Sequence, residues 1–251
     1  MKLILVGCEH VGKTTLSEGI SKWIARTMGN SRTFHDHFTV PSPELSDEDA
    51  TLFMKMSPAF KERFQRYMID YHGAAAFLGD ADHMLTGFHI EEAVFAPLYY
   101  GYGGDGQYAA RSQAARHMES SLMAVAPDTI LVLLKARPEV IRQRMKTHPM
   151  PRDQRGRRPG VLQEKDIEFV LKRFEQEYDN SLIRKKFTID NSDITPEETV
   201  REFVLKVQKL LSDSDRLRIL AHKSLLESGD AVPGIVDHIK TRPEERKKKG
   251  K

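Results

Sequence analysis

The sequence predicts a three-layer α/β fold, in which a central parallel sheet carries helices on both faces. Short apolar runs, such as Leu3–Val6 and Ile130–Leu134, alternate along the 251 residues with longer segments of helical spacing. Unbroken apolar runs are typical of parallel strands covered on both faces, and strands that alternate with helices indicate a parallel sheet. No apolar run reaches the roughly 18 residues that span a bilayer, so the pattern does not favour a membrane protein.

The first strand leads directly into a phosphate-binding loop. Residues 7–14 read Gly-Cys-Glu-His-Val-Gly-Lys-Thr, and apolar residues at helical spacing follow them. The glycines allow the backbone to wrap around an oligophosphate, and the positive end of the next helix faces the same charge. We expect Lys13 to reach the β and γ phosphates of ATP and the Thr14 hydroxyl to hold Mg²⁺. The other residues expected to line the phosphates are Gly7, Glu9, His10, Val11, Gly12 and Thr15.

The next part of the chain predicts two strands and three helices. The second strand is expected at 31–34, and the third lies within 80–88. Ser57-Pro58 has the residues of a helix start. The helix after it places Phe60, Phe64, Tyr67, Met68 and Tyr71 on one stripe, and Lys61, Arg63 and Arg66 on its other face. Further helices are expected at 91–100 and 107–124, on either side of a glycine-rich loop.

The remaining elements complete one domain and an appendage. Strands are expected at 128–134 and 186–189, helices at 138–146 and 161–178, and an arginine-rich loop at 148–160. Thr195-Pro196-Glu197-Glu198 is a capping box that opens a helix reaching Leu211. We therefore predict one domain over 1–211. Residues 212–251 are expected to be a helical extension, with a helix at 216–226, and a basic, disordered tail.

In this order the motifs resemble P-loop nucleoside and nucleotide kinases, and thymidylate kinase-like proteins most closely. The matching pieces are the N-terminal loop, the segments 89–100 and 152–158, the strand Ile130–Leu134 followed by Pro138-Glu139 and Arg144, and 187–191 followed by Thr195–Glu198. The resemblance covers about residues 1–211. It implies a three-layer P-loop kinase fold with an arginine-rich lid at about 146–162. It also implies ATP and Mg²⁺ as cofactors, and a nucleoside or nucleoside monophosphate as the small-molecule acceptor.

Arginines are the residues that the resemblance assigns to the lid. The transferring phosphoryl group spreads negative charge over its oxygens, and guanidinium groups meet that charge with paired donors. The expected lid arginines are Arg144, Arg152, Arg155, Arg157 and Arg158. A solvated or nucleic-acid-binding loop is the alternative. The resemblance also places the adenine of ATP against the loop after the last strand, near Asn191.

Asp36 is the acidic residue expected at the carboxyl end of the second strand. In α/β sheets ligands bind at that edge, and Asp36 is predicted to act as catalytic base or as a ligand of a Mg²⁺-bound water. A capped turn is the alternative. The chain departs from thymidylate kinases at the end of the third strand, where Thr86 and Gly87 replace an Asp-Arg pair.

Other residues can supply the groups that this departure removes. Glu91 or Glu92 would provide the carboxylate, and Arg63 or Arg66 the guanidinium. The alternatives are an ordinary helix N-terminus for the glutamates and a pair between Arg66 and Asp70. Tyr99, Tyr100 and Tyr102, beside the glycine-rich loop, are expected to contact the acceptor, whereas most of the aromatic residues of this region are more typical of an apolar core.

Charge and cysteine content limit the partners. The formal net charge is +3, and the C-terminal lysines form a basic run that allows, but does not favour, nucleic-acid binding. Cys8 is the only cysteine, so the chain has no internal disulfide and a cytoplasmic location is expected. A homodimer stays open. The alternative functions are a kinase of another alcohol or of modified bases in DNA, and a P-loop regulatory ATPase.

Overall fold

The computed structural model describes residues 1–29, 35–37, 46–79, 82–147 and 160–228. Within these ranges the strands form one parallel sheet in the order β2-β3-β1-β4-β5, which confirms the predicted fold class. The strands are β1 (Lys2–Val6), β2 (His35–His37), β3 (His83–Thr86), β4 (Ile130–Lys135) and β5 (Lys185–Asp190). Their carboxyl ends lie at one edge, which is where the loop after β1 begins.

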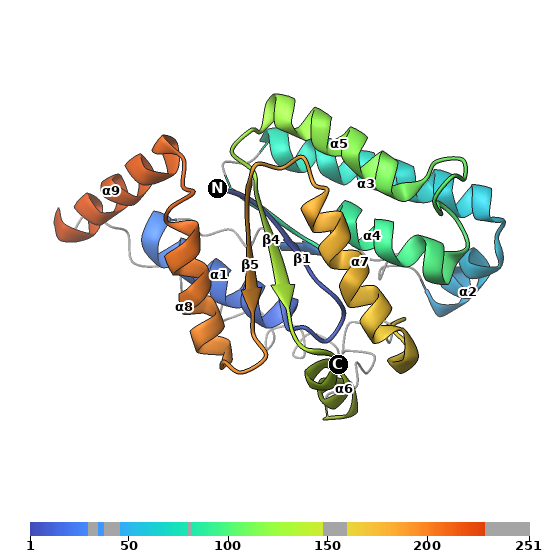
Figure 1. Cartoon of the computed structure of the whole chain (residues 1–251). Helices are drawn as coiled ribbons and strands as arrows, with labels where there is room; N and C mark the ends of the chain where they lie inside the picture. The colour runs from blue at the N-terminus through green and yellow to red at the C-terminus, as the bar shows by residue number, and fades with distance from the viewer. Residues whose placement is uncertain (30–34, 38–45, 80–81, 148–159, 229–251) are drawn as a thin grey trace, which may run out of the picture.

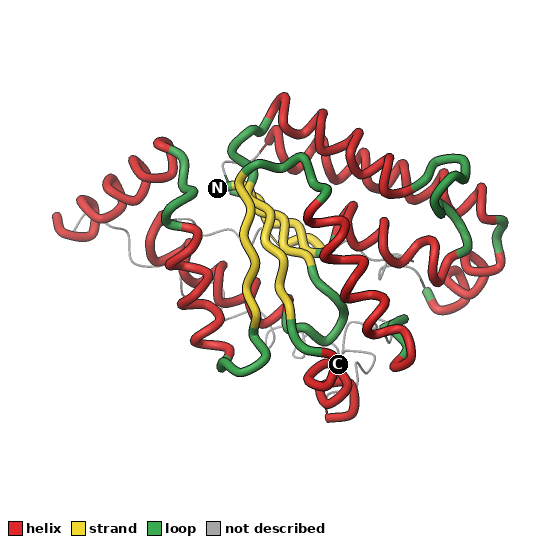
Figure 2. The backbone as a smooth tube through the Cα atoms, in the orientation of Figure 1, coloured by secondary structure: helices red, strands yellow, loops and turns green. Residues whose placement is uncertain are grey.

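Helices cover both faces of the sheet (Figure 1). The α-helices are α1 (Lys13–Met28), α2 (Asp47–Lys55), α3 (Pro58–Gly79), α4 (Phe88–Phe95), α5 (Arg111–Val125), α6 (Pro138–Thr147), α7 (Ile167–Asp179), α8 (Pro196–Val207) and α9 (Asp213–Ser228). The π-helical turn η1 (Ala96–Tyr100) continues α4, and the 3₁₀ turn η2 (Glu164–Asp166) precedes α7. Helices α1 and α8 pack together on one face, and α4 packs with α5 and α7 on the other. Figure 2 shows the sheet between these two layers.

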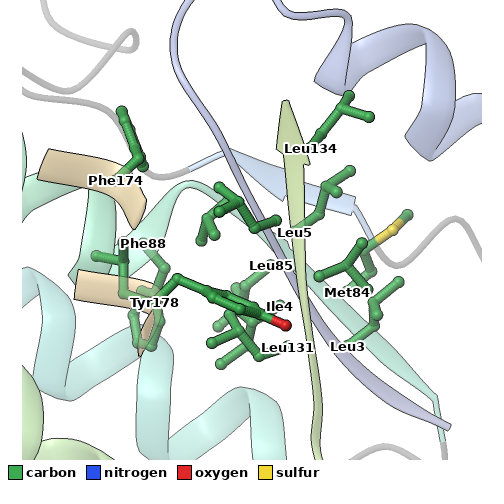
Figure 3. Packing of buried hydrophobic residues seen from close by; sticks show 14 of the residues in the cluster. Leu3, Ile4, Leu5, Met84, Leu85, Phe88, Leu131, Leu134, Phe174 and Tyr178 are labelled. Carbon is green, nitrogen blue, oxygen red and sulfur yellow. The ribbon is translucent and has the colours of Figure 1, made fainter. Parts of the chain in front are cut away.

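The core lies on both faces of the sheet. In β1, Leu3 pairs in register with Met84, and Ile4 pairs with Leu85 and Leu131. Because successive residues of a strand point to opposite faces, these two sets belong to different layers. Figure 3 shows the side that carries Phe88, Phe174 and Tyr178 and the opposite side with Leu3 and Met84. All of these side chains are buried, as their apolar runs predict.

Several elements differ from the sequence prediction at their ends. The residues 31–34, where a strand was expected, lie outside the described residues, and the strand β2 is at His35–His37. The helix α2 was not predicted. The helix expected at 91–100 is divided into α4 and η1, the one expected at 161–178 begins only with η2 and α7, and the one expected to reach Leu211 ends at Val207.

The apolar stripe expected on α3 is only partly buried. Phe60 and Tyr67 are 51% and 68% exposed, whereas Lys61, Glu62 and Gln65 are buried. Helix α3 packs against α5, and Glu62 meets a guanidinium of that helix. A buried charge with an opposite partner is tolerated where an unpaired one is not. The inner face of α3 is therefore polar in its first half.

The predicted helical extension is α9, which packs against α1. Arg218 of α9 donates to both oxygens of the buried Asp82, at 2.7 and 2.6 Å. Asp82 also pairs with the amino group of Met1. The basic segment 229–251 lies outside the described residues.

Candidate active site

The loop after β1 has the backbone shape that phosphate binding requires. Gly12 has φ +100° and immediately precedes α1. A Cβ at Gly7, where φ is +151°, would lie 2.5 Å from the carbonyl oxygen of Leu134, so β4 leaves no room for a side chain there. His10 lies between them with φ +61°, a left-handed conformation that few non-glycine residues adopt. Thr14 and Thr15 lie exposed in the first turn of α1.

Lys13 lies at the centre of this loop. Its ammonium group donates to the carbonyl oxygens of Gly7 and Cys8 and forms an ion pair with Glu91, whose Oε2 lies 3.0 Å away. Glu91 belongs to the first turn of α4, at the carboxyl edge of the sheet. Of the two glutamates proposed to replace the missing acidic residue, Glu91 is therefore the one that faces the loop.

The absence of a side chain at Gly87 leaves space for the Glu91 carboxylate. A Cβ at Gly87 would lie 2.6 Å from Oε2 of Glu91, and φ there is +85°. The carboxylate thus folds back over the glycine to reach Lys13. Burial raises the pKa of Glu91, and the positive charge of Lys13 opposes that rise.

Glu92 points to the other side of α4, into a buried cluster of charges. The Tyr102 hydroxyl donates to Oε1 of Glu92 at 3.0 Å, and Nε of Arg111 lies 3.3 Å from Oε2. Arg111 also donates to Glu62 at 2.8 Å. Burial raises the pKa of Glu92 to about 7, although Arg111 and the Tyr102 hydroxyl both lower it.

Arg66 completes this cluster from α3. Its Nε and Nη2 donate to Oε1 of Glu62 at 2.9 and 2.6 Å, in place of the pair with Asp70 that the spacing also allowed. Its guanidinium lies 5.8 Å from the centre of the Tyr108 ring. Arg63, by contrast, is exposed on the surface of α3.

A cavity of about 1000 Å³ opens beside this cluster, between α3, α4 and α5. Arg66, Glu92 and Arg111 line its polar part, and Phe88, Met118 and Leu122 line its apolar part. Pockets that bind flat organic ligands combine apolar walls with a few fixed polar groups. The structure therefore brings Arg66 and Glu92, predicted separately, to the wall of one cavity.

The side chains of Arg144 and Asn191 both bind the backbone of the phosphate-binding loop. Nη1 of Arg144 donates to the carbonyl oxygen of Val11 at 3.0 Å, and Nδ2 of Asn191 donates to the same oxygen at 2.7 Å. Nη2 of Arg144 donates to the carbonyl oxygen of Asn191 at 3.0 Å. Both side chains thus contact the backbone of the phosphate-binding loop, far from their positions in sequence.

Two of the remaining predicted residues contact the chain that enters α7. The Glu9 carboxylate accepts hydrogen bonds from the amides of residues 161 and 162, and the Tyr99 hydroxyl donates to Oδ2 of Asp166 at 3.1 Å. Burial raises the pKa of Tyr99 to about 12. Tyr100 is buried in the core.

For the other predicted residues the structure describes no side-chain position. Arg152, Arg155, Arg157 and Arg158 lie outside the described residues, and so does most of the expected lid. Asp36 lies within β2 in register with Leu85, rather than after a strand, and its side chain is not among those described. Within the described ranges, no three His, Cys, Asp or Glu residues gather as a metal site would need.

Sequence reasoning missed Glu62 and Arg111. Tyr102, expected beside the glycine-rich loop as a substrate contact, donates to Glu92. Glu62 and Arg111 are separated by 49 positions, so no local spacing relates them. The only local signal was the polar character of three buried positions in the first half of α3, Lys61, Glu62 and Gln65.

Known proteins resemble this chain in structure but not in sequence. No protein-family model and no curated protein sequence matches it. None of its described helices is both long and apolar enough to cross a bilayer.

Among solved structures, the deoxyadenosine kinase from M. mycoides with bound dCTP matches with a TM-score of 0.52 and 16% identity, over 83% of this chain and 100% of that one. The same kinase with bound dATP also matches with a TM-score of 0.52 and 16% identity, over 83% of this chain and 100% of that one. The thymidylate kinase from Candida albicans matches with a TM-score of 0.50 and 11% identity, over 84% of this chain and 95% of that one. The chain therefore has the fold of P-loop nucleoside and nucleotide kinases.

Proposed function

We propose that this protein is an ATP-dependent kinase that requires Mg²⁺ and phosphorylates a nucleoside or nucleoside monophosphate. One observation carries the proposal: Lys13 is held 3.0 Å from a buried carboxylate at the mouth of a phosphate-binding loop. The fold, which deoxyadenosine and thymidylate kinases share, supports it. We further propose residues 1–211 as the kinase domain, with a lid at about 146–162 and α9 as an extension.

The phosphates of ATP are proposed to lie in the loop, where amide groups and the N-terminus of α1 stabilise their charge. Lys13 then moves from Glu91 to the β and γ phosphates, since these carry the larger negative charge. Arg144, Arg152, Arg155 and Arg157 stabilise the transferring group. Mg²⁺, when bound, would supply positive charge at the phosphates, and the exposed Thr14 hydroxyl would offer one of the hard oxygen donors that it prefers.

The acceptor is proposed to occupy the cavity beside α4. Glu92 and Arg66 would recognise its polar edge, and Phe88 and Met118 provide an apolar wall. Glu91, released by Lys13, orients the acceptor hydroxyl or receives its proton, a role that its raised pKa suits. Asp36 is the second candidate for that role.

An acceptor panel tests the proposal. Nucleosides, nucleoside monophosphates, other alcohols and oligonucleotides are incubated with radiolabelled ATP and Mg²⁺. Lys13→Ala should abolish transfer with little change in thermal stability, whereas Lys22→Ala, at an exposed lysine on the same helix, should leave it unchanged. Labelling of oligonucleotides only would favour a DNA kinase, and slow hydrolysis without any acceptor a regulatory ATPase. Full activity of Lys13→Ala would refute the mechanism.

The proposed location is the cytoplasm, where ATP and Mg²⁺ are available. Cys8, the only cysteine, is buried within the phosphate-binding loop, and burial raises its pKa to about 12. Its thiol therefore stays protonated and unreactive.

A further inference from the structure

The carboxylate of the half-buried Glu9 accepts hydrogen bonds from a segment that is distant in sequence. Its Oε1 accepts a hydrogen bond from the amide of Val161 at 3.1 Å, and its Oε2 accepts one from the amide of Leu162 at 2.8 Å. A Cβ built at Gly160 would lie 2.4 Å from Oε2 and 2.8 Å from Cδ of Glu9. Residues 160–162 therefore lie so close to the carboxylate that a methyl group at position 160 would have to displace it.

The same stretch is fastened a second time, to η1. The amide of Gln163 donates to the Tyr99 hydroxyl at 3.3 Å, and that hydroxyl donates to Asp166. The chain that enters α7, at the C-terminal end of the proposed lid, is thus held in place, and Glu9 connects the phosphate-binding loop to it. On the other side of the loop, Arg144 and Asn191 hold the carbonyl oxygen of Val11.

His10 lies between these two attachments with φ +61°. A left-handed conformation costs a non-glycine residue on the order of 1 kcal/mol, so the loop needs outside contacts to keep it. A loop ordered before its ligand arrives loses less affinity to the cost of ordering. A free carboxylate here would also repel phosphate, and the two amide donors offset its charge.

We propose that Glu9 is a positioning residue, which ties the phosphate-binding loop to residues 160–162 and so holds it in its ATP-binding shape without contacting the nucleotide. The inference rests on the proposed function, because its effect is on ATP. It predicts that Glu9 and Gly160 act as one unit.

A double-mutant cycle tests this unit. Glu9→Ala removes the carboxylate, and Gly160→Ala displaces it with a methyl group. Each variant should raise the Kd and the KM for MgATP about tenfold, the equivalent of one lost hydrogen bond, and leave the KM for the acceptor unchanged. In the double variant the methyl group has room, so its Kd should be no higher than that of Glu9→Ala. Glu164→Ala, an exposed glutamate of the same stretch, is the control and should bind MgATP as the unchanged protein does.

Two results would overturn the inference. The first is that Glu9→Ala binds MgATP as tightly as the unchanged protein, or more tightly, since that would mean that the acid only repels phosphate. The second is that the effects of the two substitutions on the Kd multiply in the double variant. If Glu9→Ala does not fold, Glu9→Gln, which keeps one acceptor oxygen, replaces it with a smaller expected loss.

Thermal unfolding of the four ligand-free proteins gives the same cycle without nucleotide. Non-additive midpoints support the tie, and additive midpoints contradict it. Calorimetry of the unchanged protein with MgATP stands apart: an absence of binding there would refute the proposed function, whatever the unfolding cycle gives.

Discussion

Replacing Glu92 by glutamine should stabilise the folded chain at alkaline pH and change it little in acid. Burial raises the pKa of Glu92 from 4.5 to about 7. The unfolded chain therefore releases this proton at lower pH than the folded chain does. Stability that the neutral carboxyl contributes is fully present below about pH 4.5 and is lost as the pH rises toward 7. Glutamine has no proton to lose, so its variant escapes this loss.

The size of the effect follows from the shift. For pKa values of 4.5 and about 7, linkage predicts that the free energies of unfolding of the two proteins diverge by roughly 2 to 3 kcal/mol between pH 5 and pH 8. Arg111 keeps its hydrogen bond to Glu62 in the variant, so no guanidinium is left unpaired. The Tyr102 hydroxyl still has an amide oxygen to which it can donate.

Denaturation with urea at both pH values measures this difference. Glu197→Gln, at an exposed glutamate of α8, corrects for the general effect of one lost charge. Parallel pH profiles for the Glu92 variant and the unchanged protein would refute the reasoning. They would mean that Arg111 and Tyr102 stabilise the ionised carboxylate as strongly as burial opposes it.

Two further substitutions test the packing around Glu91 and the attachment of α9. Gly87→Ala should lower the free energy of unfolding by about 2 kcal/mol or more, because φ there is +85° and the methyl group would meet Glu91. Thermal unfolding measures the loss of stability, and titration with MgATP measures the Kd. An unchanged Kd for MgATP would mean that the position of Glu91 does not affect nucleotide binding. Arg218→Ala should cost about 2 kcal/mol, because Asp82 stays buried with one cation fewer; urea denaturation measures it, and faster amide exchange confined to α9 should accompany it.

The sheet and the phosphate-binding loop were predictable because their signals are local. The loop motif, the strand before it and the helix after it occupy consecutive residues, so spacing alone places Gly12 and Lys13. The partner of Lys13 was harder to predict. Glu91 and Glu92 are neighbours with equal propensities, and only the space above Gly87 directs one of them to Lys13. The direction of a side chain in the first turn of a helix depends on tertiary packing, which local sequence patterns do not predict.

The polar face of α3 illustrates the other limit. Spacing rules place the apolar stripe inward, because burying an unpaired charge is costly. That cost disappears for Glu62 once Arg111 of α5 and Arg66 of its own helix donate to the same oxygen. The residue that decides the orientation of α3 thus lies in another helix, beyond a glycine-rich loop. The cavity opens beside this cluster, so the charges that override the hydrophobic pattern are also those proposed to contact the acceptor. The polar inner face of α3 and the polar wall of the cavity therefore have the same cause, which is the packing of α3 against α5.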